Sequence, residues 1–157
     1  MSILSDRDVK AFMERGHISI EPFKEERLTP NGYDLSMAEI LIPAMDLRLK
    51  SGKAQIPPLT WFLVGTLERI RLGAKVSAQL WIKSGWARKG ILGSFGKVDA
   101  GFEGILTLSA FNASQKVLEL TIGDPFAQIV FEALTSDAIL TYEKRSGHYQ
   151  GQNEIKL

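Results

Sequence analysis

The residues from Lys75 to Ile82 alternate between apolar and polar side chains, with the apolar members on one face. That period of two predicts a β-strand with one buried face. Residues 105–111 are apolar almost throughout, which predicts a strand buried on both faces, and residues 127–134 predict another strand. Turn signals such as Gly123-Asp124-Pro125 separate these runs. Short strands with frequent turns predict a mainly β barrel or sandwich.

One short helix is expected at the N-terminus, over residues 5–15, within an N-terminal segment 1–22. Ser5 can cap the helix, and acidic residues in its first turn suit the helix dipole. Gly16 ends it. The apolar face has spacings of three and four residues and consists of Val9, Phe12 and Met13.

Length and composition predict one domain spanning residues 1–157. Hydrophobic residues make up 45% of the chain and charged residues 24%, which is ordinary for a soluble globular protein. The chain has no cysteine, which excludes disulfides and thiolate metal sites, and two histidines make a multi-histidine zinc site improbable. A net charge of +1 without a basic stripe argues against general nucleic-acid binding.

The first residues lack the pattern of a signal peptide, and no apolar run approaches the length of a membrane span. We therefore expect a cytoplasmic protein. The C-terminal segment 144–157 is rich in glycine and amide side chains, with little aliphatic content before Ile155. We expect it to be too polar to join the core, and to be either frayed or a flexible lid that orders over a ligand.

The segment from Lys83 to Gly90 is a candidate phosphate site. Ser84 and Gly85 break the chain after a strand, and the first amides of a following short helix can bind phosphate. Lys83 adds charge, and Arg88 can grip phosphate oxygens through two hydrogen bonds. The alternative is a surface turn with solvated cations, in which Trp86 belongs to the core.

Asp99 is the candidate catalytic carboxylate. It precedes Ala100-Gly101 in a compact turn, where it can act as a general base for water or accept a hydrogen bond from a sugar hydroxyl. Alternatively, its side chain only stabilises the hairpin as an Asx turn. Phe102 follows, either in the core or beneath a deoxyribose ring.

Asp34 follows the turn signal Asn31-Gly32 and is flanked by Tyr33 and Leu35. A charge between apolar neighbours is costly without a hydrogen bond or a cation nearby. Asp34 therefore either pins the turn or helps to position a hydrated Mg²⁺ ion.

Taken together, these segments resemble the dUTPase and dCTP deaminase superfamily. The resemblance runs in order through nearly the whole chain, and single motifs are weak whereas the ordered set is specific. The opening from Ile3 to Phe23 and the tail with Tyr142 are similar to the deaminase branch. The motifs that carry the resemblance are Thr29-Pro30-Asn31-Gly32-Tyr33-Asp34-Leu35, Ser84-Gly85-Trp86-Ala87-Arg88, Gly96-Lys97-Val98-Asp99-Ala100-Gly101-Phe102-Glu103-Gly104, Gly123-Asp124-Pro125-Phe126-Ala127-Gln128-Ile129-Val130-Phe131 and His148-Tyr149-Gln150-Gly151-Gln152.

The resemblance implies a distorted jelly-roll-like β-barrel, a homotrimer with sites at subunit interfaces, a deoxynucleoside triphosphate substrate and Mg²⁺. It implies that Asp99 activates water and that Asp34 reaches the ion through water. The implied phosphate-binding residues are Lys83, Ser84, Gly85, Trp86 and Arg88. The implied base- and sugar-binding residues are Phe95, Gly96, Val98 and Phe102, with Tyr149 and Gln152 closing the site from a neighbouring subunit.

Ser109 distinguishes the two branches of the superfamily. Deaminases of the superfamily carry a glutamate at the matching position, and a serine hydroxyl cannot shuttle protons as a carboxylate does. We therefore expect a dUTP diphosphatase, which releases dUMP and pyrophosphate, without deaminase activity. Three alternatives stay open: a dCTP deaminase with one or two activities, a non-catalytic deoxynucleotide-binding regulator, and a plain structural β domain.

Overall fold

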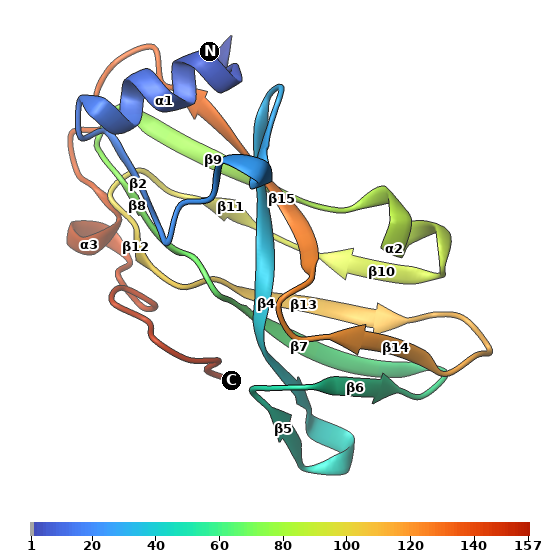
Figure 1. The fold of residues 1–157 in the computed structure, drawn as a ribbon. Helices are drawn as coiled ribbons and strands as arrows, with labels where there is room; N and C mark the ends of the chain where they lie inside the picture. The colour runs from blue at the N-terminus through green and yellow to red at the C-terminus, as the bar shows by residue number, and fades with distance from the viewer. Residues whose placement is uncertain (1) are drawn as a thin grey trace.

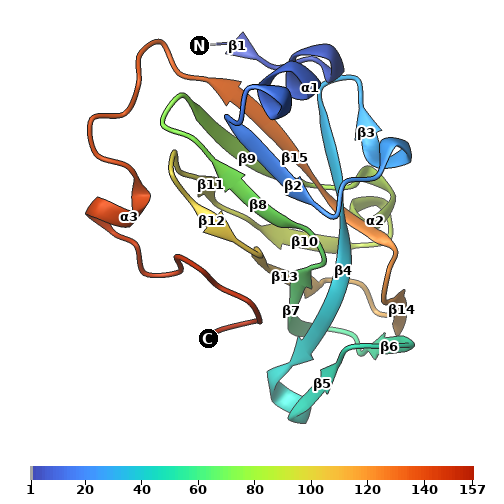
Figure 2. The same ribbon diagram turned by 60° about the vertical axis from the view of Figure 1, so that its left-hand side comes forward.

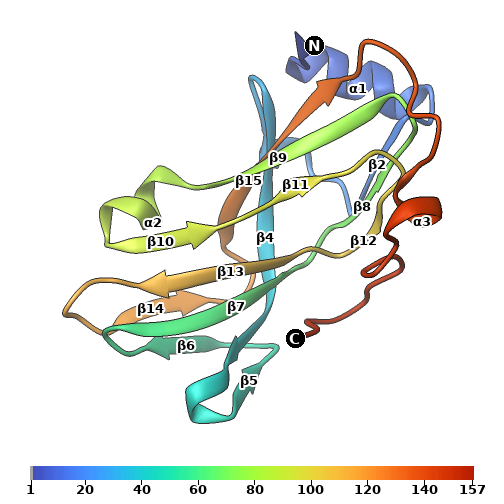
Figure 3. The ribbon, with the colours of Figure 1, turned by 180° about the vertical axis from the view of Figure 1, so that it is seen from behind.

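A computed structural model describes residues 2–157 and is mainly β, as expected. Its largest sheet has ten strands, seven of them in the order β10-β13-β7-β4-β15-β9-β11, with β1, β3 and β5 pairing at its sides. The sheet curls around the core, as Figures 1 and 3 show. Its strands are β1 (Ser2–Ile3), β3 (Leu28–Thr29), β4 (Gly32–Ile42), β5 (Leu47–Leu49), β7 (Thr60–Thr66), β9 (Val76–Ile82), β10 (Ile91–Ser94), β11 (Lys97–Val98), β13 (Thr107–Asn112) and β15 (Pro125–Ala133).

Two smaller sheets complete the fold, and all strand pairs in the structure are antiparallel. Figure 2 shows the three-stranded sheet beside β9 and β15. It has the order β12-β8-β2, and the other small sheet pairs β14 with β6. Their strands are β2 (Ile18–Glu21), β8 (Arg69–Leu72), β12 (Glu103–Gly104), β6 (Lys53–Ile56) and β14 (Leu118–Thr121).

The helices are short. The expected N-terminal helix is confirmed as α1 (Asp6–Glu14), whose Ser5 and Asp8 form a reciprocal capping box. Such a cap is worth about 1 kcal/mol. Val9 is buried, which docks α1 on the core. The others are α2 (Ser84–Arg88), α3 (Tyr142–Arg145) and the 3₁₀ turns η1 (Glu25–Arg27) and η2 (Pro43–Met45). Among residues 2–157, no helix combines the length and the apolar character needed to cross a bilayer.

The barrel interior is filled by aliphatic and aromatic side chains from all three sheets. Phe126 is fully buried there, with the Phe62 ring 6.1 Å and the Trp86 ring 6.2 Å from it between centroids. The largest fully buried side chains include Tyr33, Phe62, Phe126 and Phe131. Burial of such rings is the main stabilising contribution in a core of this kind.

The prediction that residues 105–111 are buried on both faces is wrong. Burial alternates along β13, where Leu108 and Ala110 face the core while Ser109 and Phe111 are half-buried on the outer face. The apolar run misled the prediction because Phe111, although apolar, lies on the outer face of β13. No other segment of the chain that the structure describes fully covers that face.

The C-terminal segment lies against the barrel, so the expectation that it is too polar to join the core is wrong for Gln152 and Ile155, which are both buried. Ile155 is 3% exposed and packs with Leu41 and Leu63. Its backbone N–H donates to the buried carboxylate of Glu39, 3.1 Å away. A single aliphatic residue suffices here because the barrel presents a complementary apolar patch and an acceptor.

Candidate functional site

The segment from Asp99 to Gly104 forms a tight turn that ends in β12. The Phe102 N–H donates to the Asp99 carbonyl at 3.1 Å, and the chain then passes through Gly101 with φ of 90°. That left-handed conformation suits glycine. It turns the Ala100 carbonyl toward α3, where it accepts from the Tyr142 N–H at 2.8 Å.

A cavity of about 300 Å³ opens beside this turn. Asp99 is the only carboxylate among the residues of 2–157 that line it. Its lining combines apolar side chains with hydroxyl, amide and ammonium groups. The lining residues are Leu80, Gly96, Lys97, Val98, Asp99, Phe102, Ile105, Leu106, Thr107, Tyr142, Tyr149, Gln152 and Lys156. The structure thus brings together six predicted site residues, namely Gly96, Val98, Asp99, Phe102, Tyr149 and Gln152.

Lys97 places an ammonium group on the cavity wall, where it is paired with a buried carboxylate. Its ammonium donates to the Glu132 carboxylate at 2.9 Å, and the Gln79 amide donates to the other oxygen of Glu132 at 2.6 Å. The Glu132 side chain is 5% exposed, so its charge is compensated by these two donors. The Lys97 side chain is thereby held along the wall near Asp99.

The C-terminal segment supplies the opposite wall. Gln152 is 2% exposed, and its side-chain amide donates to the Thr107 hydroxyl. Its carbonyl accepts from the Ile105 N–H at 2.9 Å. Tyr149 is partly exposed at the rim, with its N–H donating to the Tyr142 hydroxyl at 3.0 Å. The wall is therefore held by contacts within one chain.

Phe102 and Phe95 occupy different places. Phe102 is largely buried and packs edge-on against Tyr142, with centroids 5.6 Å apart, while it still lines the cavity of Asp99. Phe95 lines an adjoining cavity of about 590 Å³, which shares Leu80, Gly96 and Lys97 with the first. Its ring covers Gly93 so closely that a Cβ there would lie 2.6 Å from it.

The predicted phosphate segment does not line the cavity of Asp99. Ser84, Gly85 and Arg88 are exposed on α2. Figures 1 and 3 place α2 on the side of the molecule opposite α3 and the C-terminal segment. Trp86 instead anchors α2, because its indole N–H donates to the Pro125 carbonyl at 2.9 Å. One chain alone therefore does not unite the phosphate segment with Asp99.

Lys83 and Asp34 form an ion pair with each other. The Asp34 side chain is 15% exposed, and its second oxygen is buried without a hydrogen-bond partner. Among residues 2–157, no three histidine, aspartate or glutamate side chains cluster as metal ligands. A carboxylate already paired with an ammonium is a poor Mg²⁺ ligand, so these residues do not fit a resident magnesium site.

Several lining residues carry no recognisable signal in the sequence. Lys97 and Thr107 flank the Asp99 segment in sequence, but Thr107 shares a face of β13 with Ser109, which does not line the cavity, so alternation along the strand does not single it out. Lys156 near the C-terminus also stands in no pattern. Glu39 is 4% exposed and accepts from Arg48 and from the Ile155 N–H, a role that only the folded structure reveals.

A family model described as dCTP deaminase-like matches residues 3–134. The chain belongs to the dCTP deaminase-like family. This membership confirms the superfamily expected from the motifs, and it supports an enzyme of nucleotide metabolism.

Archaeal relatives extend the match over almost the whole chain. A protein named dCTP deaminase from Thermococcus kodakarensis is 45% identical over 145 residues, which cover 91% of this chain and 92% of the relative. Its namesake from Pyrococcus horikoshii is 44% identical, with 90% of both chains covered. One from Aeropyrum pernix is 32% identical, with 99% of this chain and 94% of the relative covered.

These relatives correct the expected function. The prediction of a dUTP diphosphatase without deaminase activity is wrong as the main assignment, because the matched family and the relatives of high identity are dCTP deaminases by name. The prediction failed because it let one position, Ser109, outweigh the rest of the chain. In the structure, Ser109 accepts a hydrogen bond from the Trp61 indole at 2.8 Å and does not line the cavity of Asp99.

Solved structures confirm the fold alone. A 2'-deoxycytidine 5'-triphosphate deaminase from Agrobacterium tumefaciens has a TM-score of 0.70 at 20% identity and covers 84% of this chain, which spans 48% of that protein's length. A native EIAV dUTPase has a TM-score of 0.57 at 18% identity, with 82% of this chain and 98% of that chain covered. The expected dUTPase-like barrel is therefore confirmed.

Proposed function

We propose that this protein is a dCTP deaminase. The observation that carries the proposal is the identity of 43–45% with archaeal proteins of that name, over about nine tenths of each chain. The cavity beside Asp99 suits the substrate class, because it combines apolar side chains for a base and sugar with hydrogen-bonding groups that can read a base edge.

The reaction consumes dCTP and water and yields dUTP and ammonia. Water adds to C4 of the cytosine ring, with one of its protons ending on ring N3. The other proton ends on the leaving nitrogen as the C4–N4 bond breaks and the C4 carbonyl forms. A group that accepts a proton and then returns it is needed beside C4. We assign this role to Asp99, the carboxylate that lines the cavity, rather than to the Ser109 position.

Binding groups surround Asp99 in the proposed complex. Gln152 and Thr107 offer amide and hydroxyl groups to the base, and Phe102 is an apolar lining residue against which the deoxyribose packs. Phe95 and the backbone at Gly96 and Val98 shape the adjoining end. Tyr149 covers the rim. Magnesium, in this proposal, comes with the triphosphate as its counter-ion and has no protein site of its own.

The groups that bind the triphosphate come from α2 of a second copy of the chain, where the Lys83–Asp34 ion pair orients them. They are the Ser84 hydroxyl, the Gly85 and Trp86 backbone amides and the Arg88 guanidinium. A homotrimer closes such head-to-tail contacts into a ring, with a composite site at each interface. Two partly exposed tryptophans support an association surface near these elements: Trp81 on β9 and Trp61 on β7.

The test uses purified protein with Mg²⁺ and dCTP, and measures ammonia together with the base of the remaining nucleotide. Ammonia and a uracil nucleotide in equal amounts support the proposal. Nucleotide binding without ammonia, or pyrophosphate release from the nucleotide without ammonia, would overturn it. A thermal shift with dCTP separates binding from turnover.

A further inference from the structure

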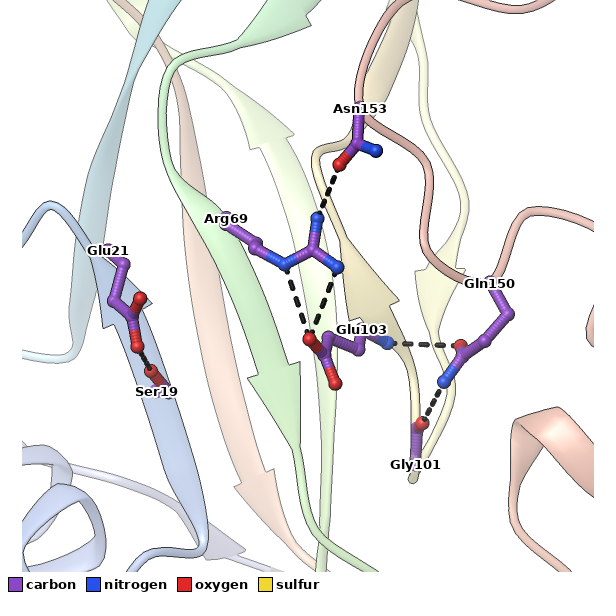
Figure 4. Close-up of polar contacts among 7 residues, drawn as sticks. All are labelled: Ser19, Glu21, Arg69, Gly101, Glu103, Gln150 and Asn153. Carbon is purple, nitrogen blue, oxygen red and sulfur yellow. Dashed lines mark hydrogen bonds and ion pairs between the residues drawn. The ribbon is translucent and has the colours of Figure 1, made fainter.

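Arg69, the first residue of β8, bridges two segments that are far apart in the sequence. Its Nε and Nη2 donate to the Glu103 carboxylate at 3.2 and 3.1 Å, and its Nη1 donates to the Asn153 side-chain oxygen at 2.7 Å. Figure 4 shows the guanidinium between the two partners. Both partners adjoin cavity residues, because Glu103 follows Phe102 and Asn153 follows Gln152.

A second connection runs alongside through Gln150. Its side-chain amide donates to the Gly101 carbonyl and accepts from the Glu103 N–H, both at 3.1 Å. Figure 4 shows this fork beside the arginine bridge. The Gly151 N–H donates to the Glu103 carbonyl at 2.8 Å, and Gly104 and Gln152 form a parallel bridge. The C-terminal wall is thus fastened to the Asp99 turn along one continuous seam.

Arg69 acts on this seam from outside the cavity. It does not line the cavity of Asp99; it lines a separate hollow of about 60 Å³ with Ser19, Glu21 and Arg71. In that hollow, Glu21 accepts from the Ser19 hydroxyl at 2.7 Å and has no hydrogen bond to Arg69 (Figure 4). A planar guanidinium can hold two acceptors in fixed directions at once, whereas an ammonium acts as a point charge.

We propose that Arg69 is a positioning residue for nucleotide binding, which holds the wall of Tyr149 and Gln152 against the Asp99 turn. The identity of the nucleotide rests on the proposed function. The bridge from Arg69 to Glu103 and Asn153, which we call the clasp, rests on the contacts of Arg69. Because Arg69 and Glu103 are 34% and 42% exposed, the ion pair alone contributes little to global stability. Its effect lies in the placement of the wall.

Hydrogen exchange in the protein without nucleotide tests the clasp. We compare Arg69→Gln with Arg71→Gln, a control on the same strand whose guanidinium donates to the Gly16 carbonyl at 3.3 Å instead. In Arg69→Gln, the amides of Gly151 and Ile105 should exchange about three- to tenfold faster, while exchange in the core stays unchanged. Equal exchange in the two variants would overturn the proposal.

Two conservative variants make the test specific. Arg69→Lys keeps a positive charge for Glu103 but loses the hydrogen bond to Asn153. Its exchange rates at Gly151 and Ile105 should therefore lie between those of the native protein and of Arg69→Gln. Asn153→Ala should have no further effect when it is added to Arg69→Gln, because both changes break the same bridge. Full additivity of the two changes would contradict a shared bridge.

Kinetics with dCTP provide the functional readout. Arg69→Gln should raise KM about three- to tenfold and change kcat less than about twofold, because the residue places a binding wall and does not touch the reacting atoms. A fall in kcat at unchanged KM would contradict this role. Absence of ammonia from the native protein would reject the proposed function, and the exchange experiment would still test the clasp.

Discussion

The Lys83 ammonium donates to the Asp34 carboxylate and joins the N-terminus of α2 to β4. The sequence assigned Lys83 to phosphate and Asp34 to a hydrated metal ion, yet the two side chains neutralise each other. The pair fixes the position from which α2 presents Ser84 and Arg88. Its role in the single chain is therefore to orient the phosphate segment.

A double-mutant cycle measures this pair. Lys83→Met leaves a carboxylate that is 15% exposed without its cation, which should cost about 1–3 kcal/mol of unfolding free energy. Adding Asp34→Asn to that variant should restore part of the loss, because no uncompensated charge remains. Urea unfolding at one protein concentration checks this. A double variant that loses the full sum of the single changes would contradict the pairing.

Mixed oligomers test whether the site is composite. Asp99→Asn chains and Arg88→Ala chains should each be inactive alone, yet co-assembled chains should recover activity at about a quarter of the sites, where each partner supplies the residue the other lacks. Chains with both changes, mixed with Asp99→Asn chains, serve as the control and should recover nothing. If co-assembly is shown by tag capture and activity stays absent, the two residues do not meet across an interface.

Gly101 is the position where a methyl group should do most harm to the cavity. A Cβ there would lie 2.3 Å from the Thr141 Cβ, at a backbone φ of 90°. Gly101→Ala should therefore cost more than about 2 kcal/mol and raise KM, because α3 and the C-terminal wall must move. Gly123→Ala is the matched control, with φ of 97° and no atom within 4 Å. It should cost only about 1 kcal/mol and leave KM unchanged.

Glu68 should make stability depend on pH. Burial raises the pKa of its carboxyl above the ordinary value of 4.5, against the opposing hydrogen bonds from Ser36. The folded state then holds the proton more tightly than the unfolded state, so this group reduces stability as pH rises from about 4.5 through the raised pKa. Relative to the native protein, Glu68→Gln should gain stability across that window in urea unfolding. A difference that is constant with pH would refute this.

Local patterns predicted much of the fold. Ser5 and Asp8 place the start of α1, and Asn31-Gly32 place the turn that joins β3 to β4, where Thr29 pairs with Gly32. These features depend on neighbouring residues, so the sequence carries them directly. The segment 144–157 behaves differently. Ile155 is buried because Leu41 and Leu63 receive it, and no pattern near Ile155 announces that distant patch.

The sequence also predicted part of the candidate site. Asp99, Phe102 and Gln152 meet in one cavity, as the order of motifs implied. The order of motifs along the chain does not show where each motif lies in space. It therefore could not predict that α2 lies on the side of the molecule opposite the C-terminal segment. Ser109 misled the functional prediction because the residue expected at this position in deaminases does not indicate which carboxylate lines the cavity of this chain.

The central claim is that dCTP is deaminated in the cavity of Asp99. The most direct measurement follows ammonia and uracil nucleotide from dCTP for the native protein, Asp99→Asn and the exposed control Asp124→Asn. We expect one ammonia per uracil nucleotide for the native protein and the control, and a rate lower by about 10²- to 10⁴-fold for Asp99→Asn, with dCTP binding retained. Absence of ammonia from the native protein, or near-native turnover by Asp99→Asn, would contradict the claim.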